Sequence, residues 1–269
     1  MAQRAIGTVV GLMLAWGVGA AQAADAPLQL HYDIYSGGFT TVNFDVTVVE
    51  GAEAYRMDFA AHTVGVANLM FGFTVQSSSE GQVTADGAIP AAFHTSSTSH
   101  ARDRSAHLVF QGSHVEAELR PPQDDEEGAL TPVTPDMLIG TVDPLSGILG
   151  LARAVASGER CDRRVAVFDG RRRYDLVFEE AGTETLEPTS RSLFSGVARR
   201  CKMAFNRLGG YPVDTSKRVT GNDGMIWFAT ILPNTPPVPV LIMFDGRFGM
   251  SRVYLAGMSH GADIRKVAD

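Results

Sequence analysis

DPLSGILGLARAVASGERCDRRVAVFDGRRRYDLVF, residues 143–178, decides the fold because it holds the signals for a helix and for a hairpin of two strands. Asp143 can cap a helix at its N-terminus, and Pro144 fits the first helical position, where no backbone N–H is needed. Further on, Asp169 and Gly170 separate two apolar runs and are typical of a tight hairpin turn. The stretch therefore predicts a helix that is followed by two antiparallel strands.

The predicted helix has one apolar face. Its apolar residues recur at intervals of three and four and are Leu145, Ile148, Leu149, Ala152 and Val155. Gly158 then ends the helix, since glycine accepts the left-handed conformation that follows many helices. An apolar stripe of this kind must be buried. We expect it to lie against the sheet face that the hairpin extends.

Upstream of the helix, apolar and polar residues alternate, as they do in strands with one buried face. The pattern is clear in residues 28–35 and again in residues 41–48, where Val42, Phe44 and Val46 share one face. Similar patterns recur along the rest of the chain. The sequence therefore predicts a mainly β protein of the α+β class, with a curved antiparallel sheet or half-barrel and a covering helix.

The chain has two cysteines, Cys161 and Cys201, and neither belongs to a C-x-x-C motif. Cys201 falls in a predicted strand, residues 193–205, on an inward face that includes Val197. In an oxidising compartment, a lone pair of distant cysteines is expected to form one structural disulfide. The alternative is a redox-active pair, for which C-x-x-C is the usual spacing.

Residues 1–23 predict a signal peptide. One basic residue, Arg4, precedes an apolar run over residues 5–18, and the small residues Ala21 and Ala23 fit a cleavage site. The apolar run is shorter than the roughly 20 residues that a spanning helix needs. We therefore expect cleavage after Ala23, export to the periplasm, and no transmembrane segment in the remaining chain.

Composition favours a packed globular protein, since 45% of the 269 residues are hydrophobic. The net charge of −7 makes bulk attraction to nucleic acid unexpected. Residues 24–269 are expected to form a single β-rich domain. Residues 121–135 contain an acidic, proline-bounded segment that predicts an exposed loop, with strand patterns continuing on its far side.

Three motifs stand out in and after the opening stretch. They are DPLSGIL (143–149), FDGRRRYDL (168–176) and FSGVARRC (194–201), and YDIYSGGF (32–39) lies near the other end of the chain. With these motifs the sequence resembles an exported bacterial family, domain of unknown function 3108. That family looks like the lipoprotein-carrier (LolA/LolB-like) superfamily, in which helices cover the concave side of an antiparallel half-barrel. The resemblance implies an architecture and an exported location, and it supplies no catalytic residues.

Two apolar faces are candidates to line a ligand cavity. One belongs to the strand at 41–48 and the other to the helix, and together their residues are Val42, Phe44, Val46, Leu145, Ile148 and Leu149. Residues 64–73, a nearly continuous apolar run with two glycines, predict a short helix or an irregular crossing. If this run is exposed it forms the lip of such a cavity, and if it is buried it is a core connection.

Arginines form the most suggestive polar feature of the sequence. They are Arg171, Arg172, Arg173, Arg199 and Arg200. Guanidinium groups bind phosphate and carboxylate through paired hydrogen bonds, so such a patch fits lipid headgroups, polysaccharide or an acidic envelope protein. The alternative is an exposed hairpin whose arginines pair with nearby acids, namely Asp162, Asp169, Asp175 and Glu179.

Motifs for metal or phosphate chemistry are lacking. Four histidines, His94, His100, His107 and His114, fall at near-regular intervals in predicted strands, but without the spacing of a metal site. Phosphate-binding glycine motifs are absent, and a Ser-His-Asp site would have to assemble from scattered residues. The sequence therefore predicts no catalytic residue, no metal and no cofactor.

The leading hypothesis is a non-enzymatic periplasmic protein that binds a hydrophobic or amphipathic ligand in cell-envelope maintenance. Two alternatives stay open: a structural or interaction module with a filled interior, and an uncharacterised envelope hydrolase. A cavity on the Val42, Phe44 and Val46 face favours the first hypothesis and a packed interior the second. A cleft that holds a histidine beside a carboxylate favours the third.

Overall fold

The computed structural model describes residues 26–84, 87–100, 102–123, 130–213, 223–233, 235–246 and 249–267. The predicted signal peptide, residues 1–23, and residues 124–129 of the predicted acidic loop lie outside these ranges. Within them, no helix is both long and apolar enough to cross a membrane.

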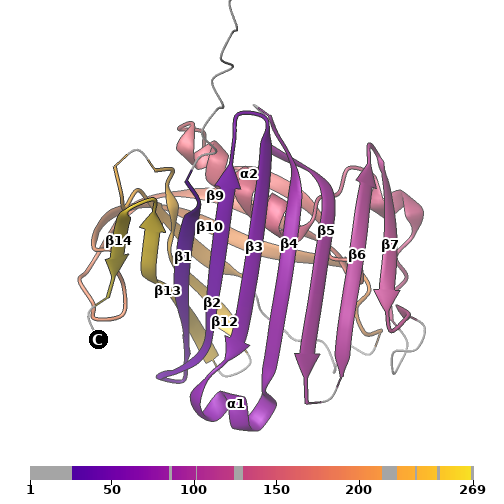
Figure 1. The fold of residues 1–269 in the computed structure, drawn as a ribbon, viewed down its shortest axis with the longest axis horizontal. Coiled ribbons are helices and arrows are strands. Elements are labelled where there is room, and N and C mark those ends of the chain that lie inside the picture. The colour runs from indigo at the N-terminus through magenta and orange to yellow at the C-terminus, as the bar shows by residue number, and fades with distance from the viewer. Residues whose placement is uncertain are drawn as a thin grey trace, which may run out of the picture.

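Fourteen strands form one antiparallel sheet (Figure 1). The first seven along the chain are β1 (Leu28–Ser36), β2 (Phe39–Glu50), β3 (Ala54–Thr63), β4 (Phe73–Thr84), β5 (Gly87–Ser99), β6 (Asp103–Gln111) and β7 (His114–Arg120). The other seven are β8 (Arg163–Phe168), β9 (Arg173–Leu186), β10 (Gly196–Gly209), β11 (Gly224–Ala229), β12 (Val238–Gly246), β13 (Gly249–His260) and β14 (Asp263–Lys266). The described helices are α1 (Gly65–Phe71), α2 (Pro144–Ala156) and the 3-10 helix η2 (Pro135–Leu138).

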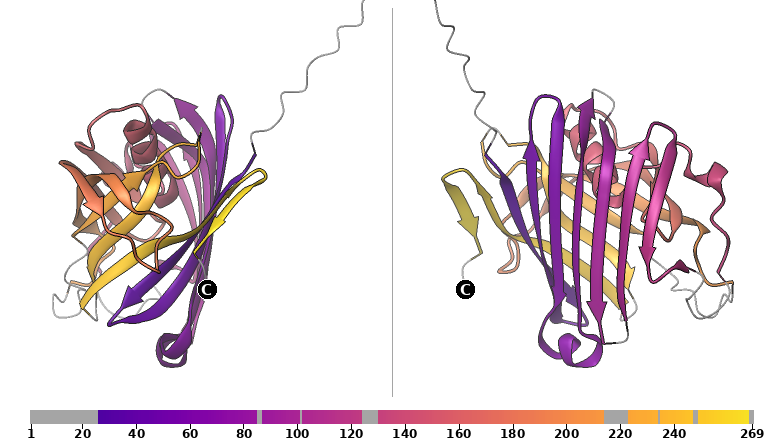
Figure 2. Two further views of the ribbon diagram at one scale, coloured as in Figure 1. Left: turned by 90° about the vertical axis from the view of Figure 1, so that its left-hand side faces the viewer. Right: turned by 45° about the vertical axis from the view of Figure 1, so that its right-hand side comes forward.

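The sheet is folded over on itself and is not closed. Its strand order is β7-β6-β5-β4-β3-β2-β1-β13-β12-β11-β10-β9-β8, with β14 paired to β13. Figure 2 shows β1 to β7 as one layer and the later strands crossing behind it, with α2 at one end between the layers. The prediction of a mainly β fold, with a curved antiparallel sheet and a covering helix, is confirmed.

The helix α2 starts and ends where the sequence predicts. The Asp143 carboxylate accepts hydrogen bonds from the backbone N–H groups of Leu145 and Ser146, at 2.9 and 3.1 Å, and Pro144 is the first helical residue. Gly158 follows the helix with a φ of +83°, the left-handed conformation that glycine adopts without strain.

Both layers of the sheet contact α2. Leu149 packs against Tyr55 and Met57 of β3. Leu151 and Val155 pack into a separate cluster with buried residues of β8 to β11. The predicted apolar stripe therefore lies against two faces instead of one, and the helix acts as a spacer between the layers.

A buried polar cluster fixes the start of α2 to the first layer. The second carboxylate oxygen of Asp143 accepts a hydrogen bond from Ser146 Oγ and another from Ser79 Oγ of β4, the latter at 2.9 Å. The Tyr55 hydroxyl lies 2.5 Å from Ser146 Oγ and 3.3 Å from Ser79 Oγ. All four side chains are buried, so these hydrogen bonds replace the water that the groups lose on folding.

Burial raises the pKa of the Asp143 carboxyl above its ordinary value of 3.8. The hydrogen bonds from Ser146, Ser79 and the Leu145 backbone act in the opposite direction but do not cancel it. Burial likewise raises the pKa of the Tyr55 hydroxyl. The folded protein therefore binds a proton at Asp143 more tightly than the unfolded chain does.

The loop between β8 and β9 joins the free end of the sheet to the first layer. Phe168 packs in a core cluster with Phe93, Leu108 and Val115 of β5 to β7. A Cβ atom on Gly170 would lie 2.7 Å from the Ala106 Cβ of β6, which shows how closely the backbone approaches that strand.

Hydrogen bonds complete this junction. The Arg171 guanidinium donates to the carbonyl of Pro121 at 2.7 Å, just beyond the end of β7. The backbone N–H groups of Arg171 and Arg172 donate to the Asp169 carboxylate, which holds the loop in its turn. Packing and side-chain hydrogen bonds thus hold β8 and β9 against β6 and β7.

One predicted side-chain direction is wrong. Val197 was expected to face inward from its strand together with Cys201, but its side chain is 66% exposed, whereas Ala198 and Cys201 are buried. The pairing of β10 with β9 shifts register between Arg199 and Cys201. A bulge of this kind inserts one residue and reverses the alternation of inward and outward side chains.

Substituting Gly170 tests the junction between the β8–β9 loop and β6. Gly170→Ala is expected to lower the free energy of unfolding by about 2–4 kcal/mol, because a Cβ there meets Ala106 and because the φ of +96° strains an alanine. Gly158→Ala is the matched control, since its φ is also positive but no atom lies within 4 Å of the added Cβ. It is expected to cost about 1 kcal/mol. If urea unfolding showed that both variants lose the same free energy of unfolding, the close approach of Gly170 to Ala106 would be contradicted.

A second prediction concerns the dependence of stability on pH. Because the folded-state pKa of Asp143 is raised, its contribution to stability is present in acid and is lost as pH rises through that pKa. Asp143→Asn carries no such titration. Relative to the natural protein, this variant is therefore expected to become progressively more stable as pH rises from 3.8 through the folded-state pKa of Asp143, measured by urea unfolding.

Glu180 provides a control of opposite sign. Burial tends to raise its pKa, but hydrogen bonds from Arg199 and from the Cys161 N–H outweigh burial and lower the pKa below 4.5. Its contribution to stability is present above that value and is lost as pH falls through the folded pKa. Glu180→Gln should therefore destabilise the protein at neutral pH and approach the natural protein in acid. If the free energies of unfolding of Asp143→Asn and Glu180→Gln changed with pH in the same direction, the opposite pKa shifts of Asp143 and Glu180 would both be refuted.

Candidate functional site

A cavity of about 460 Å³ lies between the inner face of β3 to β6, the first turns of α2 and the β8–β9 loop. Its apolar lining comprises Phe59, Val75, Phe93, Ala106, Pro144, Leu145 and Ile148. Its polar lining comprises Ser77, Thr95, Ser97, Arg104, Ser105, Asp169, Arg171 and Arg172. We call this the inner cavity, and its two kinds of lining suit a molecule with an apolar and a polar part.

Hydroxyl groups form one wall of the inner cavity. Ser77 Oγ of β4 and Thr95 Oγ1 of β5 lie 2.8 Å apart and are hydrogen-bonded to each other. The strand pairing places Phe59 beside Ser77 and Ser77 beside Thr95, so all three share the inward face. The inner face of β4 and β5 is therefore partly polar where it meets the cavity.

Arginines stand at one end of the inner cavity. Arg172 is exposed, and its guanidinium lies 5.9 Å from the centre of the Tyr211 ring. Arg171 is held by the Pro121 carbonyl. The carboxylate of Asp169 accepts hydrogen bonds from the backbone N–H groups of Arg171 and Arg172. The cavity thus combines apolar walls with a cationic end.

The six residues predicted to line a cavity divide into two groups. Leu145 and Ile148 line the inner cavity, while Leu149 is buried against β3. Val42, Phe44 and Val46 lie on the inner face of β2 but do not line this cavity. Phe44 is instead packed between two rings, with centroid distances of 4.7 Å to Tyr32 and 5.4 Å to Phe59.

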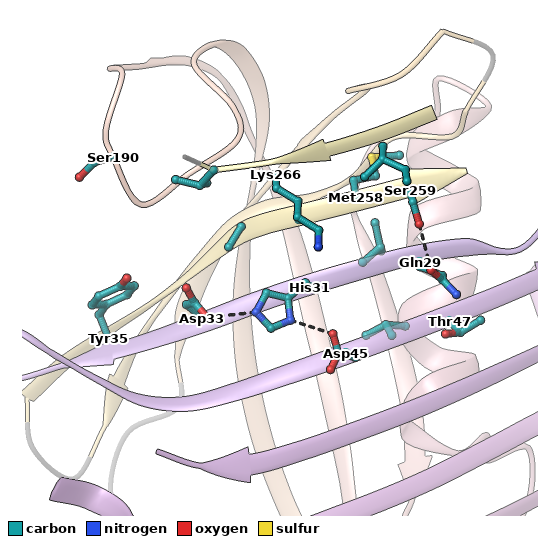
Figure 3. A pocket seen from close by; sticks show the side chains of 16 residues that line it. Gln29, His31, Asp33, Tyr35, Asp45, Thr47, Ser190, Met258, Ser259 and Lys266 are labelled. Atoms are coloured by element: carbon teal, nitrogen blue, oxygen red, sulfur yellow. Dashed lines mark hydrogen bonds and ion pairs between the residues drawn. The ribbon is translucent and has the colours of Figure 1, made fainter. Parts of the chain in front are cut away.

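A second cavity of about 770 Å³ lies on the outer face, where β1, β2, β13 and β14 meet (Figure 3). We call it the outer groove. Its lining is mainly polar and includes Gln29, Thr47, Ser190, Ser259 and Lys266. Figure 3 shows Lys266 reaching from β14 over the strand that carries His31.

His31 is held between two carboxylates in the outer groove. Its Nδ1 lies 2.7 Å from Asp45 Oδ1, and its Nε2 lies 3.4 Å from Asp33 Oδ1. Asn43 also donates a hydrogen bond to Asp33, at 2.8 Å. Both ring nitrogens of His31 are therefore directed at carboxylates and not at a hydroxyl group.

Residues 257–261, GMSHG, have the G-x-S-x-G spacing of a hydrolase nucleophile, which is the sequence signal for a serine site in this chain. The motif functions in a sharp turn from a strand to a helix. Here Ser259 lies inside β13, which continues to His260 and turns into β14. The Ser259 hydroxyl donates to the Gln29 side chain at 3.0 Å. The arrangement in the outer groove therefore lacks the nucleophile–base hydrogen bond of a Ser-His site.

The structure does not bring the five predicted arginines together. Arg199 pairs with Thr183 of β9, ten residues along the strand from Arg173, which corresponds to about 33 Å. The Arg173 guanidinium is buried and donates to the Met137 carbonyl and to Asp175, both at 2.7 Å.

Ion pairs hold the arginines of β10. Arg199 donates to the Glu180 carboxylate at 2.8 Å, and Arg200 donates to the Glu184 carboxylate at 2.9 Å. The Arg200–Glu184 pair is half-exposed and contributes little to stability, whereas the Arg199–Glu180 pair is mostly buried. Both pairs orient their side chains. The arginines of the β8–β9 loop and those of β10 are therefore two separate features, and the first of them borders the inner cavity.

The four histidines considered for metal binding are spread over several strands. His94 and His107 are directly paired across β5 and β6, with ring centroids 6.1 Å apart. The backbone N–H of His100 donates to the Gly72 carbonyl, and His114 begins β7. In the part of the chain that is described, no three histidine, cysteine or acidic side chains are grouped to hold a metal ion.

Cys161 and Cys201 form a disulfide, with their Cα atoms 6.0 Å apart. Both residues are fully buried in the cluster that packs Leu151 and Val155 of α2 against the second layer. The bond ties the segment after α2 to β10. It therefore fixes the helix that forms one wall of the inner cavity.

Comparisons with known proteins give a family and a similar solved structure. A family model described as "Protein of unknown function (DUF3108)" matches residues 31–255. The crystal structure of a "Beta-barrel-like Protein of Domain of Unknown Function DUF1849 from Brucella abortus" is similar over 90% of this chain and 99% of that chain, with 14% sequence identity and a TM-score of 0.49. No curated protein matches the chain.

Removing the disulfide is expected to lower stability. The bond closes a loop across a sequence separation of 40 residues, which corresponds to about 4 kcal/mol on the chain-entropy model. Reduction, or the double substitution Cys161→Ala with Cys201→Ala, should lower the melting temperature in calorimetry while the folded spectrum is retained. An unchanged melting temperature would mean that the bond is not a structural link.

Proposed function

The chain belongs to the DUF3108 family of proteins of unknown function, and from this premise we propose that it is an exported, non-enzymatic protein of the cell envelope that binds a hydrophobic or amphipathic ligand. The ligand occupies the inner cavity, with its apolar part along Phe59, Val75 and Ile148. Its polar part meets the hydroxyl wall and the β8–β9 loop.

The observation that carries the proposal is the composite lining of the inner cavity. A volume of about 460 Å³ lies within the range of roughly 300–1,000 Å³ that small-molecule sites occupy. Apolar side chains from β3, β4, β5 and α2 supply most of the contact surface. A purely polar ligand would leave these apolar side chains without favourable contacts, and a purely apolar one would displace water from the polar side of the lining without replacing its hydrogen bonds.

The charges at the cavity predict the sign of the ligand's polar group. Arg172 presents an exposed guanidinium group, while Arg171 is bonded to the Pro121 carbonyl and Asp169 is engaged by backbone N–H groups of its own loop. Guanidinium groups bind phosphate and carboxylate strongly. We therefore propose an anionic head group that contacts Arg172 at the mouth of the cavity.

Export is supported by the sequence of residues 1–23 and by the disulfide. Structural disulfides persist in oxidising compartments such as the periplasm. The resemblance to the lipoprotein-carrier superfamily adds a fold-level analogy, because α2 covers the inner face of an open antiparallel sheet. The proposed role in envelope maintenance rests on this analogy and on the cavity together.

A filled interior is the second candidate, because part of the inner face is packed. Tyr32 and Phe44 stack at 4.7 Å, and their neighbours on β1, β12 and β13 form a continuous cluster. In this view the protein is an interaction module. The hydrolase alternative has less support, because the ring nitrogens of His31 face carboxylates and Ser259 is bonded to Gln29.

Native mass spectrometry of protein purified from its own periplasm tests the proposal. The natural protein is expected to carry an extractable amphipathic molecule or to take up an added fatty acid or anionic phospholipid. Val75→Trp places a large ring in the inner cavity and should reduce uptake at least tenfold. Gln76→Trp is the matched control, because the adjacent side chain is exposed on the opposite face and should leave uptake unchanged.

Two results would contradict the ligand-binding function. One is natural protein that carries no lipid and takes up none. The other is uptake that Val75→Trp and Gln76→Trp reduce equally, which would locate the ligand elsewhere. Circular dichroism and the melting temperature establish that both variants are folded.

A further inference from the structure

Large apolar side chains are exposed at the end of the molecule that lies opposite α2 (Figure 1). Their exposed fractions are 82% for Leu69, 72% for Phe39, 68% for Met70 and 65% for Val66. Three belong to α1, and Phe39 begins β2 beside it. We call these four residues the apolar tip.

The apolar tip projects from a well-anchored helix. The Val64 N–H donates to the Thr41 carbonyl of β2 at 3.0 Å, which holds the start of α1 against that strand. The buried hydroxyl of Thr63 donates to the Asn68 side chain at 2.9 Å and accepts the Phe73 N–H at 3.0 Å. The side chains of the tip are therefore held outward by a fixed backbone.

The segments that form the apolar tip carry no charged residue. None of residues 36–41, 63–73 and 249–251 is acidic or basic, in a chain of which 20% is charged. Ser36 pairs with both Phe39 and Ser251, so the start of β13, with the exposed Met250, lies at the same end. Soluble surfaces rarely leave such a set of large apolar residues uncovered unless it has a binding role.

We infer that the apolar tip inserts into the surface of a lipid bilayer. Figure 2 shows α1 projecting beyond the ends of the strands, so the tip is convex and can enter the boundary between headgroups and acyl chains. A bilayer accepts apolar side chains without requiring hydrogen bonds in a fixed register. The absence of charged residues from the segments that form the tip matches hydrocarbon.

A protein partner fits these features less well. Protein interfaces carry about one hydrogen bond per 100–200 Å² and a polar rim that fixes orientation. The tip offers aliphatic and aromatic groups on a protruding helix, with no charged residue in the segments that form it. A second copy of the chain is the other possible occupant, and the experiment below separates it from a bilayer.

The tip lies next to the inner cavity along the chain. Val75 of the cavity follows α1 by four residues, and Ser97 of the cavity lies three residues before His100, whose N–H donates to the Gly72 carbonyl after α1. An amphipathic ligand leaving a bilayer at the tip would reach the cavity after a short path. The transfer of a ligand from the bilayer to the cavity rests on the proposed function. Binding of the tip to a bilayer does not, and it can be measured without a ligand.

Vesicle flotation tests the inference with full protein that has the same N-terminus in every variant. The vesicles contain phosphatidylethanolamine and phosphatidylglycerol, and the natural protein is expected to float with them. Leu69→Glu combined with Met70→Glu should weaken vesicle binding about a hundredfold, since removing each apolar side chain from the bilayer lowers the affinity by about tenfold or more. Val197→Glu combined with Ile264→Glu is the matched control, because both residues are similarly exposed but lie on β10 and β14.

A fluorescence measurement locates the contact. Leu69→Trp is expected to show a blue shift and quenching by brominated lipid, whereas Gln76→Trp should show neither. Equal binding by the tip and control variants would overturn the inference, as would absence of vesicle binding by the natural protein. If the tip substitutions change sedimentation of the protein alone and not its flotation, the tip is a contact between copies and the inference is also wrong.

The two proposals fail in different ways. Val75→Trp should abolish ligand uptake and leave flotation intact if both are correct. Ligand uptake without flotation would remove the bilayer contact and leave the binding function in place. Flotation of a protein that takes up no ligand would remove the ligand-binding function and leave the bilayer contact in place.

Discussion

The contact of the β8–β9 loop with β6 determines how this sheet encloses an interior. β7 and β8 are the two edges of the sheet in the described strand order, and they are not neighbours in it. Gly170 brings the loop backbone against Ala106, and Arg171 bonds to the Pro121 carbonyl. Side-chain packing at this junction replaces the strand pairing that would close a barrel, and it leaves room beside α2 for the inner cavity.

The helix α2 keeps the two layers apart, and the Asp143 cluster fixes its position. A buried carboxyl is costly unless hydrogen bonds satisfy it, and four donors from Leu145, Ser146 and Ser79 do so here. The same cluster links the helix to β3 and β4, which carry part of the cavity wall. The position of the helix and the shape of the cavity therefore depend on one polar network, while the disulfide secures the far end of the helix.

The cavity and the apolar tip are built on the same strands. β3 runs from the cavity wall at Phe59 into α1, and β4 returns from α1 to the wall at Val75. The arginines of the β8–β9 loop border that cavity, whereas those of β10 are held in ion pairs about 33 Å away along β9.

The sequence by itself determined the local elements, because each depends on neighbours a few residues away. These are the start of α2 at Asp143 and Pro144, the alternating strands, and a short helix or irregular crossing over residues 64–73. Only the tertiary structure decided which residues line the cavity. Strand register places Ser77 and Thr95 side by side on the inward face, next to Phe59. A bulge in β10 turned Val197 outward for the same reason: side-chain direction in a sheet follows register, which is set by partners far away in the chain.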